Sequence, residues 1–205
     1  MKTKQLFYFL AAILLVAVVL TPVQPVAAQQ TLNPPPPSFL SCKKVGTQTI
    51  CQGERVISYG PDDTGIVCGS GSENFTIFDS GTYRQSVIRY YDRNGNLTRR
   101  VIHENFTFAQ FSNPLSGAIV PYTQHNVITD DLAVPGDFSS ATETNIGENN
   151  YTLPGQGAIL LSSGRVVTAP DGSIEFRAGP QSFLDYDNGD PSAMAKMAKI
   201  CAALQ

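Results

Sequence analysis

The chain has 205 residues, with 14 Lys and Arg against 17 Asp and Glu and a net charge of −3 at pH 7. This acidic balance, without a cluster of Lys and Arg, argues against nucleic acid or an anionic membrane surface as the partner. Trp is absent, but 11 Phe and 8 Tyr supply aromatic side chains for a core.

Residues 1–28 have the three parts of a secretory signal peptide. Two lysines precede an apolar run from Leu6 to Leu20, and small residues end the segment at Ala28. The apolar run is short for a membrane span, and no second such run follows it. We therefore predict cleavage after Ala28 and a secreted, extracellular protein with no membrane span in the mature chain. Loss of the two lysines leaves 12 basic and 17 acidic residues, a net charge of −5.

The mature chain is expected to begin with a Pro-rich spacer at residues 29–40. Four consecutive prolines, Pro34 to Pro37, favour an extended polyproline conformation over packing in a core. The remaining residues, 41–205, are enough for one hydrophobic core. We expect them to form a single domain.

The first two of the four cysteines are predicted to bridge a hairpin. Gly46 and Thr47 suit a two-residue type II′ turn, whose first position needs a positive φ. Counting outward from this turn places Cys42 opposite Cys51 at a non-hydrogen-bonded pair, where the Cα atoms approach to about 4.5 Å. A cross-strand disulfide fits this geometry in an exported protein.

By elimination, Cys68 is predicted to pair with Cys201. This disulfide would close a loop of more than a hundred residues and tie the C-terminus to an early strand. The functional alternative is a zinc site, which needs CxxC or CxxH spacing that this chain lacks. We therefore expect structural disulfides.

Most of the chain alternates strands with turns, and no helical period intervenes. This pattern favours an all-β fold, either a closed or nearly closed antiparallel β-barrel or, as the alternative, a β-sandwich. The turns are marked by Asn94-Gly95 and by Pro170 to Gly172. The expected strands are Glu54–Tyr59, Ile66–Cys68, Phe75–Phe78, Tyr83–Tyr91, Leu97–Phe111, Gly117–Ile128, Ser140–Thr152, Gly157–Leu161, Arg165–Thr168 and Ile174–Arg177.

One short helix is expected at the C-terminus. Asp190 can cap it and Pro191 suits its first turn. Its apolar residues recur on one face, which we expect to cover the β structure. These residues are Met194, Met197, Cys201 and Leu204.

Four residues of the central strands form the candidate ligand-binding site. If pairing continues without interruption from the two adjoining turns, Arg89 faces Arg99 and His103 faces His125, all on one sheet face. In a barrel this face would line a lumen for a small anionic or amphipathic ligand, whereas in a sandwich it would be solvated. A shift of one residue in register would redistribute the set.

No catalytic residue, metal site or cofactor is predicted. A GxSxG elbow is absent, because the segment 69–73 lacks the closing glycine. The acidic run at 185–190 has the composition of a calcium loop, but its Gly is misplaced, so a helix-capping turn explains it better. Asn-x-Thr sequons, which matter only in a host that glycosylates, occur at Asn74, Asn96, Asn105 and Asn150.

Several segments resemble a group of small exported proteins of actinobacteria and related bacteria whose function is uncharacterised. These segments are 99–107, 113–117, 154–161, 164–167 and 201–204. The resemblance implies a bacterial secreted all-β protein and supplies no catalytic residues. A looser likeness of layout connects the chain to lipocalin-like and allene-oxide-cyclase-like barrels, and function does not follow from architecture alone.

Three functions remain open at this point. The leading hypothesis is non-catalytic binding of a small molecule or a surface glycan outside the cell, by a protein that we expect to be a monomer. The second is a structural or adhesive cell-surface module, which fits the proline spacer and the lack of catalytic motifs. The third is a hydrolase or cyclase, which would need His103 or His125 beside an acid or a nucleophilic hydroxyl.

Overall fold

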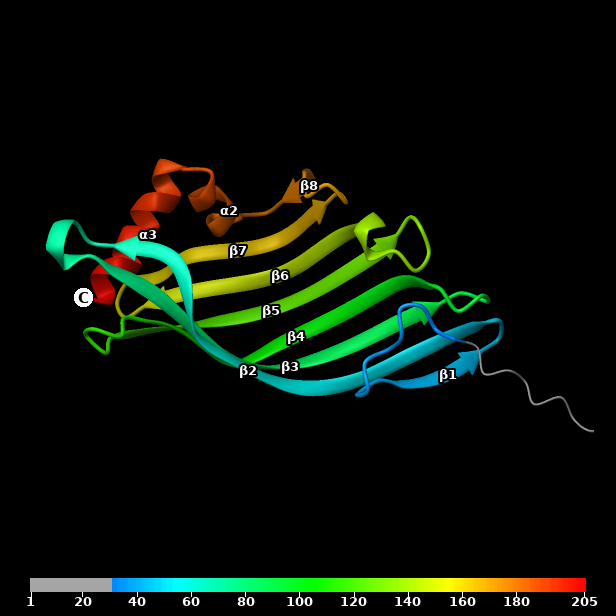
Figure 1. Ribbon diagram of the computed structural model, residues 1–205. Helices are drawn as coiled ribbons and strands as arrows, with labels where there is room; N and C mark the ends of the chain where they lie inside the picture. The colour runs from blue at the N-terminus through cyan, green and yellow to red at the C-terminus, as the bar shows by residue number, and fades with distance from the viewer. Residues whose placement is uncertain (1–30) are drawn as a thin grey trace, which may run out of the picture. The chain divides into compact units, whose positions relative to one another are not determined.

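Figure 1 shows the computed structural model of the protein, which describes residues 31–205. Eight strands form one antiparallel sheet in which each strand pairs with the next along the chain, and two helices follow the last strand. The strands are β1 (Ser41–Val45), β2 (Gln48–Cys68), β3 (Phe75–Tyr91), β4 (Leu97–Ser112), β5 (Ile119–Leu132), β6 (Ala141–Leu153), β7 (Gly157–Thr168) and β8 (Ile174–Ala178). The helices are α2 (Ser182–Asp187) and α3 (Pro191–Ala203), and 3-10 turns lie at Gly71–Glu73 and Phe138–Ser140.

The sheet is curved and open, with β1 and β8 at its edges (Figure 1). No pairing joins β1 to β8 within residues 31–205. The predicted antiparallel all-β class is confirmed, the predicted closed barrel is wrong, and the sheet does not divide into the two layers of a sandwich. Both edge strands have only five residues, so they offer little backbone for closing the sheet.

The two faces of the sheet are covered differently. We call the face covered by α2, α3 and residues 31–40 the inner face, and the opposite one the outer face. Helix α3 packs into the larger of two hydrophobic clusters, where Met197 and Ile200 meet Phe111 and Tyr122 of the sheet. Residues 31–40 pack into the smaller cluster, where Leu40 lies with side chains of β2 to β5. The inner face therefore has an apolar region at each end.

Several predicted strands merge into longer ones. The expected strands Glu54–Tyr59 and Ile66–Cys68 are both part of the 21-residue β2, which carries two register shifts between Tyr59 and Val67. A bulge absorbs extra residues without ending the pairing. The turn-forming residues in this stretch, Gly60-Pro61 among them, therefore do not separate two strands.

The C-terminal region has two helices instead of the single one predicted. Asp190 caps α3 as expected, because its Oδ1 accepts a hydrogen bond of 2.9 Å from the backbone N–H of Ala193. The short helix α2 was missed, since six residues are too few to show a helical period. Met194 is 51% exposed, so its predicted place on the buried face is wrong. The buried residues of α3 and its C-terminal cap are Ala193, Met197, Ile200 and Leu204.

Part of the predicted Pro-rich spacer lies against the sheet. The Tyr91 hydroxyl donates a hydrogen bond of 2.9 Å to the carbonyl of Pro34, and the Leu97 N–H donates one of 2.8 Å to the carbonyl of Asn33. Leu40 is buried. Residues 31–40 therefore pack on the inner face of the domain, and they end in a turn in which the Leu40 N–H donates a hydrogen bond to the carbonyl of Pro37.

Both predicted disulfides are present. Cys42 bonds Cys51 across the first hairpin, and its register is the one counted outward from Gly46, whose φ is 63°. Cys68, at the end of β2, bonds Cys201 of α3 with a Cα–Cα distance of 5.4 Å. The second disulfide therefore fastens the helix that covers the larger hydrophobic cluster.

The predicted signal peptide and its cleavage site after Ala28 lie outside the described residues. Among residues 31–205, no helix has the length and apolar character needed to cross a membrane.

The two disulfides are expected to differ in their effect on stability. In the chain-entropy model, the long loop closed by Cys68–Cys201 is worth about 5 kcal/mol and the short hairpin loop closed by Cys42–Cys51 about 3 kcal/mol. Urea unfolding of the Cys68→Ser/Cys201→Ser variant should therefore show the larger loss of unfolding free energy. The Cys42→Ser/Cys51→Ser variant is the matched control, and an equal or larger loss in that variant would contradict this account.

Candidate functional site

The four residues predicted to bind a ligand do not share one face. A register shift between Tyr90 and Tyr91 places Arg89 opposite Arg100 instead of Arg99. His103 lies opposite Val127 instead of His125. One bulge is enough to move Arg89 to the other face from Arg99, whereas the histidines are offset because the register of β4 and β5 shifts between Asn105 and Gln110. The predicted pairs Arg89–Arg99 and His103–His125 are therefore wrong.

Arg89 points to the inner face, where its Nη1 donates a hydrogen bond of 3.2 Å to the carbonyl of Pro35. On the outer face, Arg99 pairs with Asp131 at 3.0 Å. His103 and His125 are exposed on the outer face as well. The sheet therefore lies between Arg89 and the other three predicted residues. A ligand-binding role for any of the four stays a prediction.

The side chain of His125 is held by a neighbour on the outer face. Its Nδ1 lies 2.8 Å from Oδ1 of Asn105, the residue opposite it on β4. Its partner on β6 is the exposed Glu148. Both histidines are exposed, and the hydrogen-bond partner of His125 is an amide instead of an acid or a nucleophilic hydroxyl, so the arrangement gives no support to a hydrolase or cyclase site.

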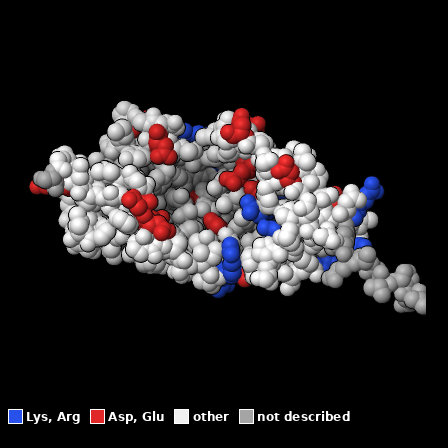
Figure 2. Space-filling model, in the orientation of Figure 1, with Lys and Arg blue, Asp and Glu red and all other residues white. Residues whose placement is uncertain are grey.

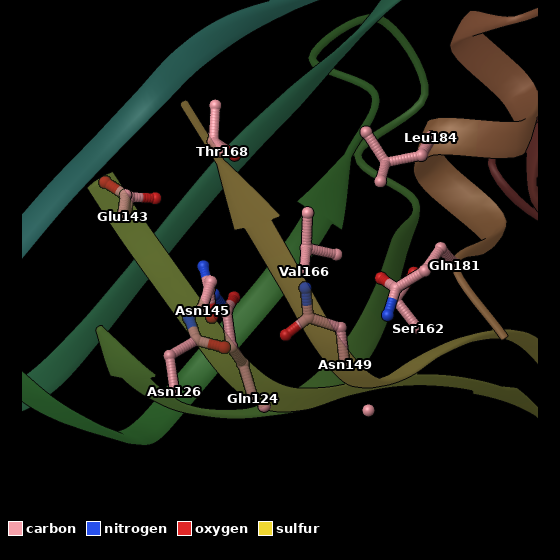
Figure 3. Close-up of a pocket in the computed structure, with 12 residues that line it drawn as sticks. Gln124, Asn126, Glu143, Asn145, Asn149, Ser162, Val166, Thr168, Gln181 and Leu184 are labelled. Carbon is pink, nitrogen blue, oxygen red and sulfur yellow. The ribbon is translucent and has the colours of Figure 1, made fainter. Parts of the chain in front are cut away.

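A polar pocket lies instead on the inner face, between β5, β6, β7 and the start of α2. Its volume is about 310 Å³, within the range of small-molecule sites. Figure 3 shows its side chains, with Glu143 at one end and Gln181 and Leu184 at the other. The lining residues are Gln124, Asn126, Glu143, Asn145, Gly147, Asn149, Ser162, Gly164, Val166, Thr168, Gln181 and Leu184.

The floor of this inner-face pocket is built from two glycines that pair across β6 and β7, Gly147 and Gly164. A Cβ on Gly147 would meet the side-chain oxygen of Asn126 and would lie 2.6 Å from the carbonyl oxygen of His125. The missing side chain therefore leaves room for the Asn126 carboxamide to lie across the sheet. Because neither glycine has a side chain, the pocket is also deeper at this point.

Carboxamides dominate the pocket wall, and one of them has an unused acceptor. The Oδ1 of Asn149 is buried and has no hydrogen-bond partner within residues 31–205. A buried carboxamide oxygen ordinarily accepts a hydrogen bond, because desolvation without one is costly. Asn and Gln both donate and accept, so this wall can recognise hydroxyl groups in either role.

A polar row crosses the inner face beside the pocket. Arg55 Nε donates to Gln85 Oε1 at 2.8 Å, and Gln85 Nε2 donates to Glu104 Oε1 at 3.0 Å. Glu104 lies opposite Asn126, which lines the pocket. This row separates the two hydrophobic clusters, so the middle of the inner face is polar while its ends are apolar.

Acidic side chains mark the rim of this region. Figure 2 shows a hollow in the face seen in Figure 1, with Asp and Glu side chains around and within it and Lys or Arg side chains at one part of its border. Glu143 lies between the pocket and the ion pair of Arg100 with Asp130, whose atoms are 2.6 Å apart. Burial raises the pKa of Glu143, and the nearby Asp130 carboxylate raises it further. The inner-face pocket, whose one charged lining residue is Glu143, therefore disfavours anionic ligands.

A second polar group joins three strands on the inner face. The Tyr122 hydroxyl of β5 donates to the Asp79 carboxylate of β3 at 2.9 Å, and the Tyr59 hydroxyl of β2 lies 2.9 Å from that of Tyr122. Tyr59 lies over Gly81, where an added Cβ would be 2.7 Å from its ring. Because Tyr122 has one proton, Tyr59 can donate to it while it donates to Asp79.

Burial governs the protonation of this group. It raises the pKa of the Asp79 carboxyl above its ordinary value, although hydrogen bonds from Tyr122 and Tyr59 oppose the shift. It also raises the pKa of Tyr59 to about 12 and the pKa values of Tyr122 and Tyr151. The tyrosines are therefore neutral donors throughout the physiological range.

Sequence reasoning missed the inner-face pocket, although one signal was present. Along β6, Glu143, Asn145, Gly147 and Asn149 alternate with other residues, so all four lie on one face of the strand. The predicted site consists of Arg and His residues instead. Gln181 and Leu184 could not have been added from the sequence, because they approach β7 only in the folded chain.

No family model, curated protein or solved structure matches this chain. The resemblance to exported bacterial proteins therefore stays a sequence-based prediction, and the site has to be interpreted from its own chemistry.

The raised pKa of Asp79 predicts a specific pH dependence of stability. A carboxyl with a higher pKa in the folded state binds its proton more tightly there, so its contribution falls as pH rises from the ordinary value of 3.8 towards neutrality. Asp79→Asn carries no charge and keeps an acceptor for Tyr122. Its unfolding free energy relative to wild type should therefore rise with pH across this window, as measured by urea unfolding.

The control for this prediction is Glu148→Gln, which removes an acid exposed on the outer face. A constant difference between Asp79→Asn and wild type at every pH would show that the Asp79 carboxyl has an ordinary pKa.

Proposed function

We propose that this protein is exported and binds an uncharged, polyhydroxylated ligand, a saccharide, in the inner-face pocket without chemically changing it. One observation carries the proposal: carboxamide and hydroxyl side chains of three adjacent strands converge over a glycine floor, and Asn149 has a buried oxygen without a protein partner. Side chains of this kind form the several directional hydrogen bonds that hydroxyl groups require.

The lining disfavours the charged or amphipathic ligands considered from the sequence. The pocket has no Lys or Arg, and its one charged lining residue is the acid Glu143. Only Val166 and Leu184 present larger apolar side chains to it. An anion would lack a counter-charge, and a long acyl chain would lack an apolar surface.

A polar peptide also fits this pocket less well than a saccharide. Extended peptides gain most of their affinity from backbone hydrogen bonds to an unpaired sheet edge. The pocket lies over β5 and β6, which are paired on both sides, and over β7, whose outer edge is bonded to β8 at Arg165–Thr168 and to Pro180 at Ser163. Recognition therefore depends on side chains, as it does for hydroxyl groups.

Export is supported by the signal-peptide pattern and by the two disulfides, which persist in oxidising compartments. We therefore place the binding event outside the cell.

A second candidate function is a cell-surface adhesive module. It is favoured by an apolar depression near the end of β2, where Val67 is 57% and Leu115 82% exposed beside Phe78 and Pro114. Isolated exposed apolar residues are common, but side chains grouped in one depression fit a contact surface. This function predicts that adhesion to cells depends on Leu115 and not on Asn149.

The saccharide proposal is tested by calorimetric titration of the exported, oxidised protein with neutral oligosaccharides of α-linked glucose, β-linked glucose and N-acetylglucosamine. Asn149→Ala should weaken binding at least tenfold, which corresponds to the loss of one or two hydrogen bonds of about 1 kcal/mol each. Because its Oδ1 has no protein partner, stability should change by less than about 1 kcal/mol.

The matched control is Glu148→Ala, the neighbouring residue of β6 on the outer face. It should bind like wild type. If none of the three series binds to the wild-type protein, the proposal is wrong; equal losses in the two variants would move the binding site away from the inner face.

A further inference from the structure

A second hollow continues the inner-face pocket beyond Glu143. It has a volume of about 300 Å³ and is lined by residues around the turn after β7 and the 3-10 turn at Phe138–Ser140. Glu143 and Thr168, which pair across β6 and β7, line both hollows. The two hollows therefore share a border instead of lying at separate places, and together they form one groove.

This groove follows the direction of β7. Its lining residues on that strand run from Ser162 to Thr168, and the second hollow continues to Gly172 in the turn that follows. The six residue steps from Ser162 to Thr168 extend for about 20 Å, which is several sugar units long. A monosaccharide would fill only part of this length.

The chemistry changes along the groove. Near α2 the wall consists of carboxamides and hydroxyls, including Asn149 and Gln181. Beyond Glu143 it includes the ring of Phe138, over which the guanidinium of Arg100 lies at 4.8 Å. The guanidinium of Arg89 also lies over this ring, at 5.8 Å, so a sugar unit packs against the part of the ring that the two cations leave exposed.

Glu143 is placed to bind at the border of the two hollows. Arg100 is paired with the buried Asp130, and the Glu143 carboxylate has no hydrogen-bond partner among residues 31–205, so it keeps a free acceptor. The carboxyl is partly buried, which strengthens a hydrogen bond to a hydroxyl group that reaches it. Hydroxyl groups of two adjoining sugar units can therefore both donate hydrogen bonds to Glu143.

We propose that the ligand is a linear oligosaccharide of several units that lies along β7, with its middle at Glu143 and its far end against Phe138. This inference rests on the proposed function, since it adds the length and direction of the ligand to a saccharide site. It predicts that affinity increases with the number of sugar units until the groove is filled.

The test is calorimetric titration of the exported, oxidised protein with the monosaccharide, disaccharide and tetrasaccharide of the three neutral series named above. We expect the tetrasaccharide to bind at least tenfold more tightly than the disaccharide. Ser139→Trp, which places a large side chain at an exposed position in the far hollow, should remove this advantage and leave disaccharide binding unchanged.

Thr142→Trp is the matched control. It places the same side chain on the outer face of β6, where Thr142 pairs with Asp131 of β5. It should keep the wild-type length dependence. Equal affinity for all lengths would overturn the extended groove and leave the saccharide pocket intact. The absence of binding in all three series would overturn the proposed function and this inference with it.

Discussion

The contact between Tyr59 and Tyr122 across the inner face is the constraint on which the rest of the structure depends. These residues belong to β2 and β5, whose backbones would stand about 14 Å apart in a flat sheet. Here the hydroxyls are 2.9 Å apart, above the Asp79 carboxylate. The residues between them, Gly81 and Ala109, are small and pair with each other, so the sheet can curve beneath the tyrosine rings.

This curvature decides where the protein has a core and where it has a hollow. Helix α3 fills one end of the inner face, and residues 31–40 fill the other. Neither α3 nor residues 31–40 cover the middle of the inner face. This middle part carries the polar row from Arg55 to Glu104 and the pocket over β5 to β7. Polar groups are stable there because they bond to each other or face the hollow.

Most of the sequence-based predictions that the structure confirms depend on residues close together in the chain. The first hairpin, with Cys42 opposite Cys51, follows from one turn and a count outward over a few residues. The cap at Asp190 follows from contacts within one helical turn. By contrast, one bulge near Tyr91 separated Arg89 from Arg99, because a single extra residue reverses every side chain beyond it.

The sequence by itself determined the strand-rich antiparallel class, the two disulfide pairings and the capped C-terminal helix, since these depend on residues near in sequence or on elimination among four cysteines. Only the tertiary structure decided that the sheet stays open and that its inner face holds a polar groove. Both depend on the summed curvature and register of eight strands. The groove also depends on segments distant in sequence that pack against β7. Gln181 and Leu184 belong to such a segment.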